Sequence, residues 1–285
     1  MNTYPAAFCL VLTCFATFSV HADTIQVSGF ANIFGAGKSV APGPGTHGGG
    51  ILPPAFNFNA GPNQIVFFTD VSALIEGAPG DFAPPDGVLH PVNAESYEGI
   101  AGVTSPVAVP LSGVFLGPDE PTDPAPDRLD FRESGIGVDF NELSPAIGQG
   151  FIIGDGLTSN SPGTRRLFHV PSSATRLYLG IFDGFHLGDT VPKLPGYYDD
   201  NGGAFTATVE LFRKPTLVIV PDQSSLSLCW QTQSDVNCQP QWTDLLHEPT
   251  WLPLGTATTG TGQMESVVIQ HESPPERFYR LIATP

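Results

Sequence analysis

The sequence predicts an all-β protein built from two β-sandwich domains, and three observations support this prediction. The 285 residues include 32 Gly and 29 Pro, residue types that interrupt helices and favour turns. Many short apolar runs, some alternating with polar residues, lie between these turn residues. No long stretch combines helical periodicity with helix caps. Apolar residues make up 41% of the chain, which distinguishes it from a disordered polymer.

The chain is strongly acidic. It has 28 acidic and 11 basic residues, and its formal net charge is −17. Because such a surface repels polyanions, we expect neither nucleic acid nor an anionic membrane as a partner. The same charge attracts cations.

Residues 1–22 predict a signal peptide. An apolar run from Ala6 to Val20 ends in Val20-His21-Ala22, and these residue types before Asp23 fit cleavage by signal peptidase. The run is shorter than the roughly 20 residues that cross a bilayer, and no later run is long enough. We therefore expect an exported protein with no membrane span, which is secreted, at the cell surface or in the periplasm.

Removal of the signal peptide would leave two cysteines, Cys229 and Cys238. In an oxidising compartment, an even pair that is close in sequence predicts one disulfide. The alternative is two unpaired thiols in neighbouring strands. A zinc site is not expected, because the spacing is not Cys-x-x-Cys and no second pair exists.

The first domain is predicted to span residues 23–213, and its strands follow from apolar runs and alternation. Thr24 to Phe34 begins with alternating apolar residues, and Gln64 to Phe68 is a buried run that continues to Leu74. The predicted strands are 24–34, 64–74, 108–116, 130–140, 177–182 and 205–211. The acidic, proline-rich segment 117–127 is expected to be an exposed loop.

The last two of these strands flank a loop rich in oxygen-bearing side chains. These are Asp183, Asp189, Asp199, Asp200 and Asn201. Calcium takes six to eight oxygen ligands, so converging carboxylates and amides on one loop suit this ion. The alternative is a plain hairpin, because Asn-Gly favours a two-residue turn and Asp or Asn caps turns without a metal.

The segment from Pro195 to Phe205, PGYYDDNGGAF, with Asp183 upstream, resembles the calcium-binding loop of LecA-like, galactose-binding bacterial lectins. In that family a strand ends in Asp, and Pro-Gly-x-Tyr-x-Asn-Asn-x-Gly-x-Phe leads into a final strand. It also resembles exported bacterial proteins with LecA-like domains. The resemblance implies a LecA-like β-sandwich with bound Ca²⁺. Asp183 would supply a carboxylate, Tyr197 its backbone carbonyl, and Asp200 and Asn201 would fill the two Asn positions.

The same resemblance implies a carbohydrate partner, such as a galactose-like glycan. The calcium ion would hold two vicinal sugar hydroxyls, and Phe185, Tyr197 or Tyr198 would supply an apolar wall. Exported LecA-like proteins are expected to have a similar Pro-Asp-Gly stretch facing the calcium loop. The resemblance therefore implies that Asp86, in the turn Pro85-Asp86-Gly87, is a ligand-binding residue, either a fifth ligand of the ion or a lip of the pocket, whereas the residues themselves favour a plain turn. Asp200 departs from the family's Asn, and the additional residues 184–194 could remodel or abolish the sugar pocket.

The second domain is predicted to span residues 214–285, after a break at Lys214-Pro215. Residues 218–220 and 226–230 are predicted strands, with Trp230 as a core anchor. The remainder, ending in Arg-Phe-Tyr-Arg-Leu at 277–281, resembles a fibronectin- or immunoglobulin-like C-terminal module of exported bacterial proteins. Such modules are accessory or surface-attachment domains.

Three functions remain for the structure to address. The first is an exported, non-catalytic, calcium-dependent carbohydrate-binding protein. The alternative is a structural or cell-surface interaction module in which calcium only stabilises a loop. An enzyme is not expected, because neither a Gly-x-Ser-x-Gly motif nor a zinc-protease motif is present. Glycoside hydrolysis stays open, because the fold and not the sequence sets the separation of its two carboxylates.

Overall fold

The computed structural model describes residues 21–44, 48–158, 163–183, 193–222, 225–233, 236–270 and 277–284. These residues form strands, turns and loops with two short 3-10 helices, η1 (Ile33–Gly35) and η2 (Tyr198–Asp200), so the predicted all-β class is confirmed. Chain contacts divide the protein into two compact units, with the boundary between Lys214 and Pro215. Within the described ranges, no helix is both long enough and apolar enough to span a membrane.

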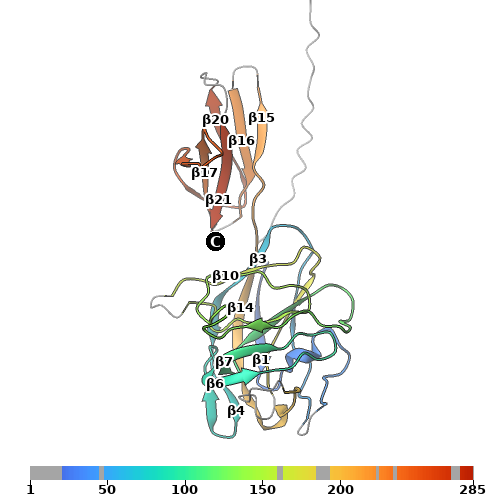
Figure 1. Cartoon of the computed structure of the whole chain (residues 1–285). Coiled ribbons are helices and arrows are strands. Elements are labelled where there is room, and N and C mark those ends of the chain that lie inside the picture. The colour runs from blue at the N-terminus through green and yellow to red at the C-terminus, as the bar shows by residue number, and fades with distance from the viewer. Residues whose placement is uncertain are drawn as a thin grey trace, which may run out of the picture. The chain divides into compact units, whose positions relative to one another are not determined.

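The larger unit is organised around one long strand, β14 (Gly202–Arg213). Strand β3 (Gln64–Ser72) pairs antiparallel with one edge of β14, and β1 (His21–Ser28) pairs antiparallel with the other (Figure 1). Apart from its last two residues, which open β1, the predicted signal peptide lies outside the described residues. The other strands of this seven-stranded sheet are β4 (Ile75–Ala78), β5 (Asp81–Ala83), β10 (Glu142–Leu143) and β12 (Leu167–His169).

Two smaller sheets complete the larger unit. A four-stranded sheet has the order β11-β8-β13-β2, and a three-stranded sheet has the order β6-β7-β9. The strands of the first are β2 (Ala55–Asn57), β8 (Ser112–Leu116), β11 (Gly150–Ile152) and β13 (Arg176–Gly180). Those of the second are β6 (Val88–Asn93), β7 (Val103–Ala108) and β9 (Leu129–Asp130).

A phenylalanine-rich core lies between the seven-stranded and four-stranded sheets. Alternate residues of β14, among them Phe205 and Val209, are buried, as expected for a strand with one face on a core. Phe151 of β11 packs on Phe168 of β12 with ring centroids 5.0 Å apart, so side chains of the two sheets meet directly. Phe115 of β8 stacks on Phe151 at 5.2 Å. This is the arrangement of a β-sandwich.

Three predicted strands differ clearly from the structure. The predicted strand 108–116 is divided, because Ala108 ends β7 and β8 begins only at Ser112. The other two are shorter than predicted. Only Asp130 of the predicted strand 130–140 belongs to a strand, because a turn begins there. The Asp130 carbonyl accepts a hydrogen bond from Ile136 N at 2.8 Å, and its carboxylate accepts one from Arg132 N at 3.0 Å. The predicted strand 24–34 ends at Ser28, where a turn leads into η1.

The smaller unit consists of two antiparallel sheets (Figure 1). One sheet contains β15 (Val218–Pro221), β16 (Ser225–Gln231) and β20 (Met264–Gln270). The other contains β17 (Asn237–Thr243), β18 (Leu252–Pro253), β19 (Thr258–Thr259) and β21 (Phe278–Thr284). Trp230 on β16 is only 2% exposed, which confirms its predicted place in the core of this unit.

The predicted disulfide between Cys229 and Cys238 is not formed, and both residues are free thiols. On β16, Leu228 and Trp230 are buried, so Cys229 between them points to the opposite face of its strand. Cys238 on β17 is buried and lies beside the Trp230 indole, on the core side. Burial raises the pKa of the Cys238 thiol, which disfavours the reactive thiolate.

We predict that alkylation without prior reduction will label both thiols once the protein is denatured in guanidinium. Peptide mapping by mass spectrometry then resolves the peptides containing Cys229 and Cys238 from those containing Cys9 and Cys14. In the native protein, Cys229 should react faster than the buried Cys238. A peptide pair joined by a Cys229–Cys238 bond would contradict the opposite-face arrangement.

Candidate functional site

The structure brings together two of the predicted metal ligands, Asp183 and Asn201. Asp183 follows β13 of the four-stranded sheet, and Asn201 directly precedes β14 of the seven-stranded sheet. The Asn201 side-chain Nδ2 donates to Asp183 Oδ2 at 2.8 Å and to the Gly29 carbonyl at 2.9 Å. Asp183 is 7% exposed and Asn201 is 5% exposed. The pair therefore links the ends of two strands from different sheets, below the protein surface.

Two buried oxygen atoms at this position lack a hydrogen-bond partner among the described residues. They are Asn201 Oδ1 and Asp200 Oδ1. The two hydrogen bonds from Asn201 Nδ2, to Gly29 and Asp183, hold the amide in one orientation. Its Oδ1 therefore points away from these two acceptors. A buried oxygen without a donor costs about 1–3 kcal/mol, and each such case calls for an explanation, such as an ion or a water molecule.

The turn that carries Tyr197, Tyr198 and Asp200 is anchored in the core. Tyr197 has a φ of 63°, in the left-handed region, and η2 follows it. The Tyr198 side chain is fully buried; its hydroxyl donates to the Ile181 carbonyl at 3.0 Å and accepts from Asp183 N at 3.2 Å. Burial, and then the Asp183 charge, raise the pKa of Tyr198 well above its ordinary value.

These contacts correct the expected role of Tyr198. A side chain with no exposed surface cannot form the apolar wall of a sugar pocket. Tyr198 instead fixes the backbone of Asp183, so it positions one candidate ligand. Tyr197 is half-buried on the same turn. Phe185, the third predicted wall residue, lies outside the described residues.

A glycine-rich loop packs against this turn, and sequence reasoning did not connect the two. Asn32 is fully buried, and its Nδ2 donates to the Pro42 and Gly49 carbonyls at 2.8 Å each. A Cβ added to Gly50 would lie 2.8 Å from Tyr198 Cβ and 2.2 Å from the Phe30 carbonyl oxygen. The loop can therefore reach Tyr198 only with glycine at position 50. The signal available in the sequence was an Asn within an apolar run, followed by a Gly-Pro-rich segment.

Asp86 belongs to a different cluster. Its carboxylate accepts a hydrogen bond from Asp155 N at 3.1 Å and lies 3.8 Å from the Arg166 guanidinium. Burial raises the pKa of Asp86, against the effect of the Asp155 hydrogen bond. Arg166 is 3% exposed and donates to the carbonyls of Ile153 and Val138, at 2.8 and 2.7 Å. Asp86 thus faces a buried arginine that cross-links the fold, a residue that the sequence did not single out.

The candidate metal ligands among the described residues, Asp183, Asp200, Asn201 and the Tyr197 carbonyl, all offer oxygen atoms. No group of three or more His, Cys, Asp or Glu side chains is placed to hold a metal in the part of the chain that the structure describes. A metal here would instead need the carboxylates of Asp183 and Asp200, the Asn201 amide oxygen and backbone carbonyls, such as that of Tyr197. Carboxylate, amide and carbonyl oxygens are the ligands of calcium, whereas zinc and copper sites are built largely on nitrogen and sulfur.

Together, the fold and this site define a two-unit, all-β protein with a buried, oxygen-lined loop site. Comparisons with protein-family models, with curated proteins and with solved structures found no match to the chain.

We predict that Asn201→Ala will lower the free energy of unfolding by about 1–3 kcal/mol in calcium-free urea denaturation, because the Gly29 carbonyl and Asp183 Oδ2 lose their shared donor. Asn59→Ala, at an exposed position, is the matched control and should change stability by less than about 0.5 kcal/mol. Equal effects for the two variants would show that the Asn201 contacts do not stabilise the fold.

Proposed function

We propose that this protein is an exported, non-catalytic calcium-binding protein whose calcium ion stabilises the loop between β13 and β14. The observation that supports this proposal is a pair of buried oxygens without a hydrogen-bond partner among the described residues, Asn201 Oδ1 and Asp200 Oδ1. They lie on neighbouring residues, and the Asn201 Nδ2 group contacts Asp183. Asp183, Asp200, Asn201 and the Tyr197 carbonyl would hold the ion. Calcium would supply a positively charged partner for these oxygens.

The burial of the proposed calcium ligands favours a structural role for the ion over a role in carbohydrate binding. Asp183 and Asn201 are both more than nine-tenths buried. Coordination positions on the side of these two residues are therefore closed to a sugar. An ion bound there would join the ends of β13 and β14, and so the two sheets of the sandwich.

This proposal predicts calcium-dependent stability. Calcium at about 100 times its dissociation constant should raise the free energy of unfolding by about 2.7 kcal/mol over that in chelator, because the ion binds only the folded state. Thermal or urea unfolding of the full chain measures this difference. In Asp200→Ala the gain should be lost, while stability in chelator should not fall, because the substitution removes an unpaired buried oxygen.

Glu133→Ala is the matched control, since Glu133 is exposed on a turn of the same unit. It removes one negative charge but should keep the full calcium effect. If calcium stabilises the protein and Asp200→Ala equally, the ion binds elsewhere and the assignment of these ligands is wrong.

Carbohydrate recognition at the same ion is the second candidate. Asp199 is exposed and Tyr197 is half-buried on the turn that carries the donors, so this side of the site is open to a hydroxyl-bearing ligand. Calcium with free coordination positions can bind two vicinal hydroxyls of a galactose-like glycan.

We expect that, if this second role applies, a glycan array will show binding in calcium that disappears in chelator and in Asp200→Ala. The Glu133→Ala protein should bind as the unmodified protein does. Calcium-dependent stability without glycan binding would leave the structural role alone, and glycan binding that persists in chelator would exclude this site as its origin.

A further inference from the structure

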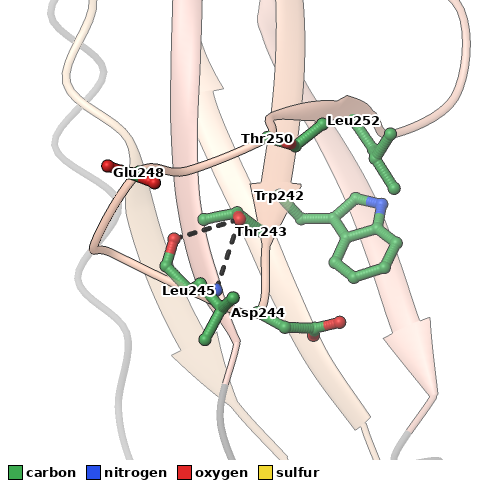
Figure 2. A pocket seen from close by; sticks show the side chains of 7 residues that line it. All are labelled: Trp242, Thr243, Asp244, Leu245, Glu248, Thr250 and Leu252. Carbon is green, nitrogen blue, oxygen red and sulfur yellow. Dashed lines mark hydrogen bonds between the residues drawn. The ribbon is translucent and has the colours of Figure 1, made fainter.

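The smaller unit contains a pocket of about 220 Å³ at the end of β17 (Figure 2). It lies between the sheet and the loop that connects β17 to β18. The residues that line it are Trp242, Thr243, Asp244, Leu245, Glu248, Thr250 and Leu252. Aromatic, aliphatic, hydroxyl and carboxylate groups thus share one small concavity.

Fixed contacts hold the walls of the pocket in place. Thr243 is 3% exposed, and its hydroxyl donates to the Leu245 carbonyl at 3.1 Å and accepts from Leu245 N at 3.3 Å, as Figure 2 shows. Arg277 lies 4.4 Å from the centre of the Trp242 ring, and its Nε is 3.6 Å from Asp244 Oδ1. Because these contacts already hold the loop and the indole, the protein would lose little conformational freedom when a ligand binds.

The surface around the pocket is apolar with an acidic rim. Leu245 and Leu246 are 66% and 60% exposed, and Leu252 is 43% exposed. Asp244 forms an ion pair with Arg277. Glu248 is exposed, has a φ of 53° and makes no ion pair with a described residue. An aromatic and aliphatic centre with a charged rim is the usual anatomy of a protein-binding surface.

Charge decides the kind of partner. The rim carries the Glu248 carboxylate, and the whole chain has a net charge of −17. Complementary charge favours a basic partner and suppresses acidic ones. Arginine and lysine also have apolar stems that pack along aromatic and aliphatic surface while the charged group stays in contact with a carboxylate.

We propose that this pocket binds a basic side chain, arginine or lysine, from a peptide segment of a partner protein. The cation pairs with Glu248, and its stem lies against Trp242 and Leu252. Apolar residues of the segment on either side of the basic residue rest on Leu245 and Leu246. This site belongs to the smaller unit and is independent of calcium.

The three tryptophans of the chain, Trp230, Trp242 and Trp251, all lie in the smaller unit. Tryptophan fluorescence of the full chain therefore reports on this unit without a label. The probe is the tripeptide acetyl-Leu-Arg-Leu-amide, and acetyl-Leu-Gln-Leu-amide and methyl galactoside are the comparison ligands. We expect a saturable change with the arginine peptide and binding at least about fivefold tighter than that of the glutamine peptide, since this ratio is about 1 kcal/mol of charge interaction. The preference should shrink as ionic strength rises.

Glu248→Gln is the test variant, because the residue is exposed and the change keeps its shape. It should reduce the affinity for the arginine peptide to that for the glutamine peptide. Trp251→Phe is the control: Trp251 lies outside the pocket lining and carries Arg280 at 4.3 Å from its ring, so the preference should persist. The proposal is overturned by the absence of a saturable change, by equal affinities for the two peptides, by an unaltered preference in Glu248→Gln, or by saturable binding of the galactoside alone.

Discussion

The larger unit depends on the requirement that both edges of β14 be hydrogen-bonded. This strand has 12 residues, and its backbone donors and acceptors would be costly to bury without partners. Strand β1 satisfies one edge from residue 204 to 211, and β3 satisfies the other from 206 to 213. Once these three strands are in register, the alternate residues of β14 must face the core. The start of β14 then fixes the position of Asn201.

The candidate calcium site follows from this pairing. Asn201 lies where β14 begins, and Asp183 lies where β13 ends, so their contact closes the sandwich at one end. Tyr198 and the glycine-rich loop hold the intervening turn from behind. The site is thus supported by the core rather than by a solvated hairpin alone. This support explains why the proposed calcium ligands Asp183 and Asn201 are buried. Their burial is the reason for proposing a stabilising ion rather than an open sugar site.

The sequence predicted those features that depend on local pattern. Alternation over Phe205 to Leu211 and the apolar run at Gln64 to Phe68 both became strands, because each places apolar side chains on a core at the strand period. The pairing of Asp183 with Asn201 also followed from the flanking strands. Residues 131–140 did not form the predicted strand, because Asp130 caps a turn and its effect is not visible in apolar periodicity.

Other features depend on contacts between distant segments. The burial of Tyr198 requires Ile181 and Gly50, and the burial of Arg166 requires the carbonyls of Ile153 and Val138. The cysteine prediction used proximity in sequence, but the face of each strand decides whether two thiols can meet. The pocket beside Trp242 likewise arises from a loop conformation held by Thr243, which no residue spacing indicates.

The position of β1 also bears on the predicted cleavage of the signal peptide. The bond between Ala22 and Asp23, where the leader is predicted to end, lies inside β1, with Ala22 opposite Glu210 and Asp23 opposite Val209. Proteolysis concentrates at exposed chain termini and loop tips rather than in paired strands. Cleavage at this bond would therefore have to take place before β1 joins the sheet, so that loss of the leader would precede closure of the sandwich.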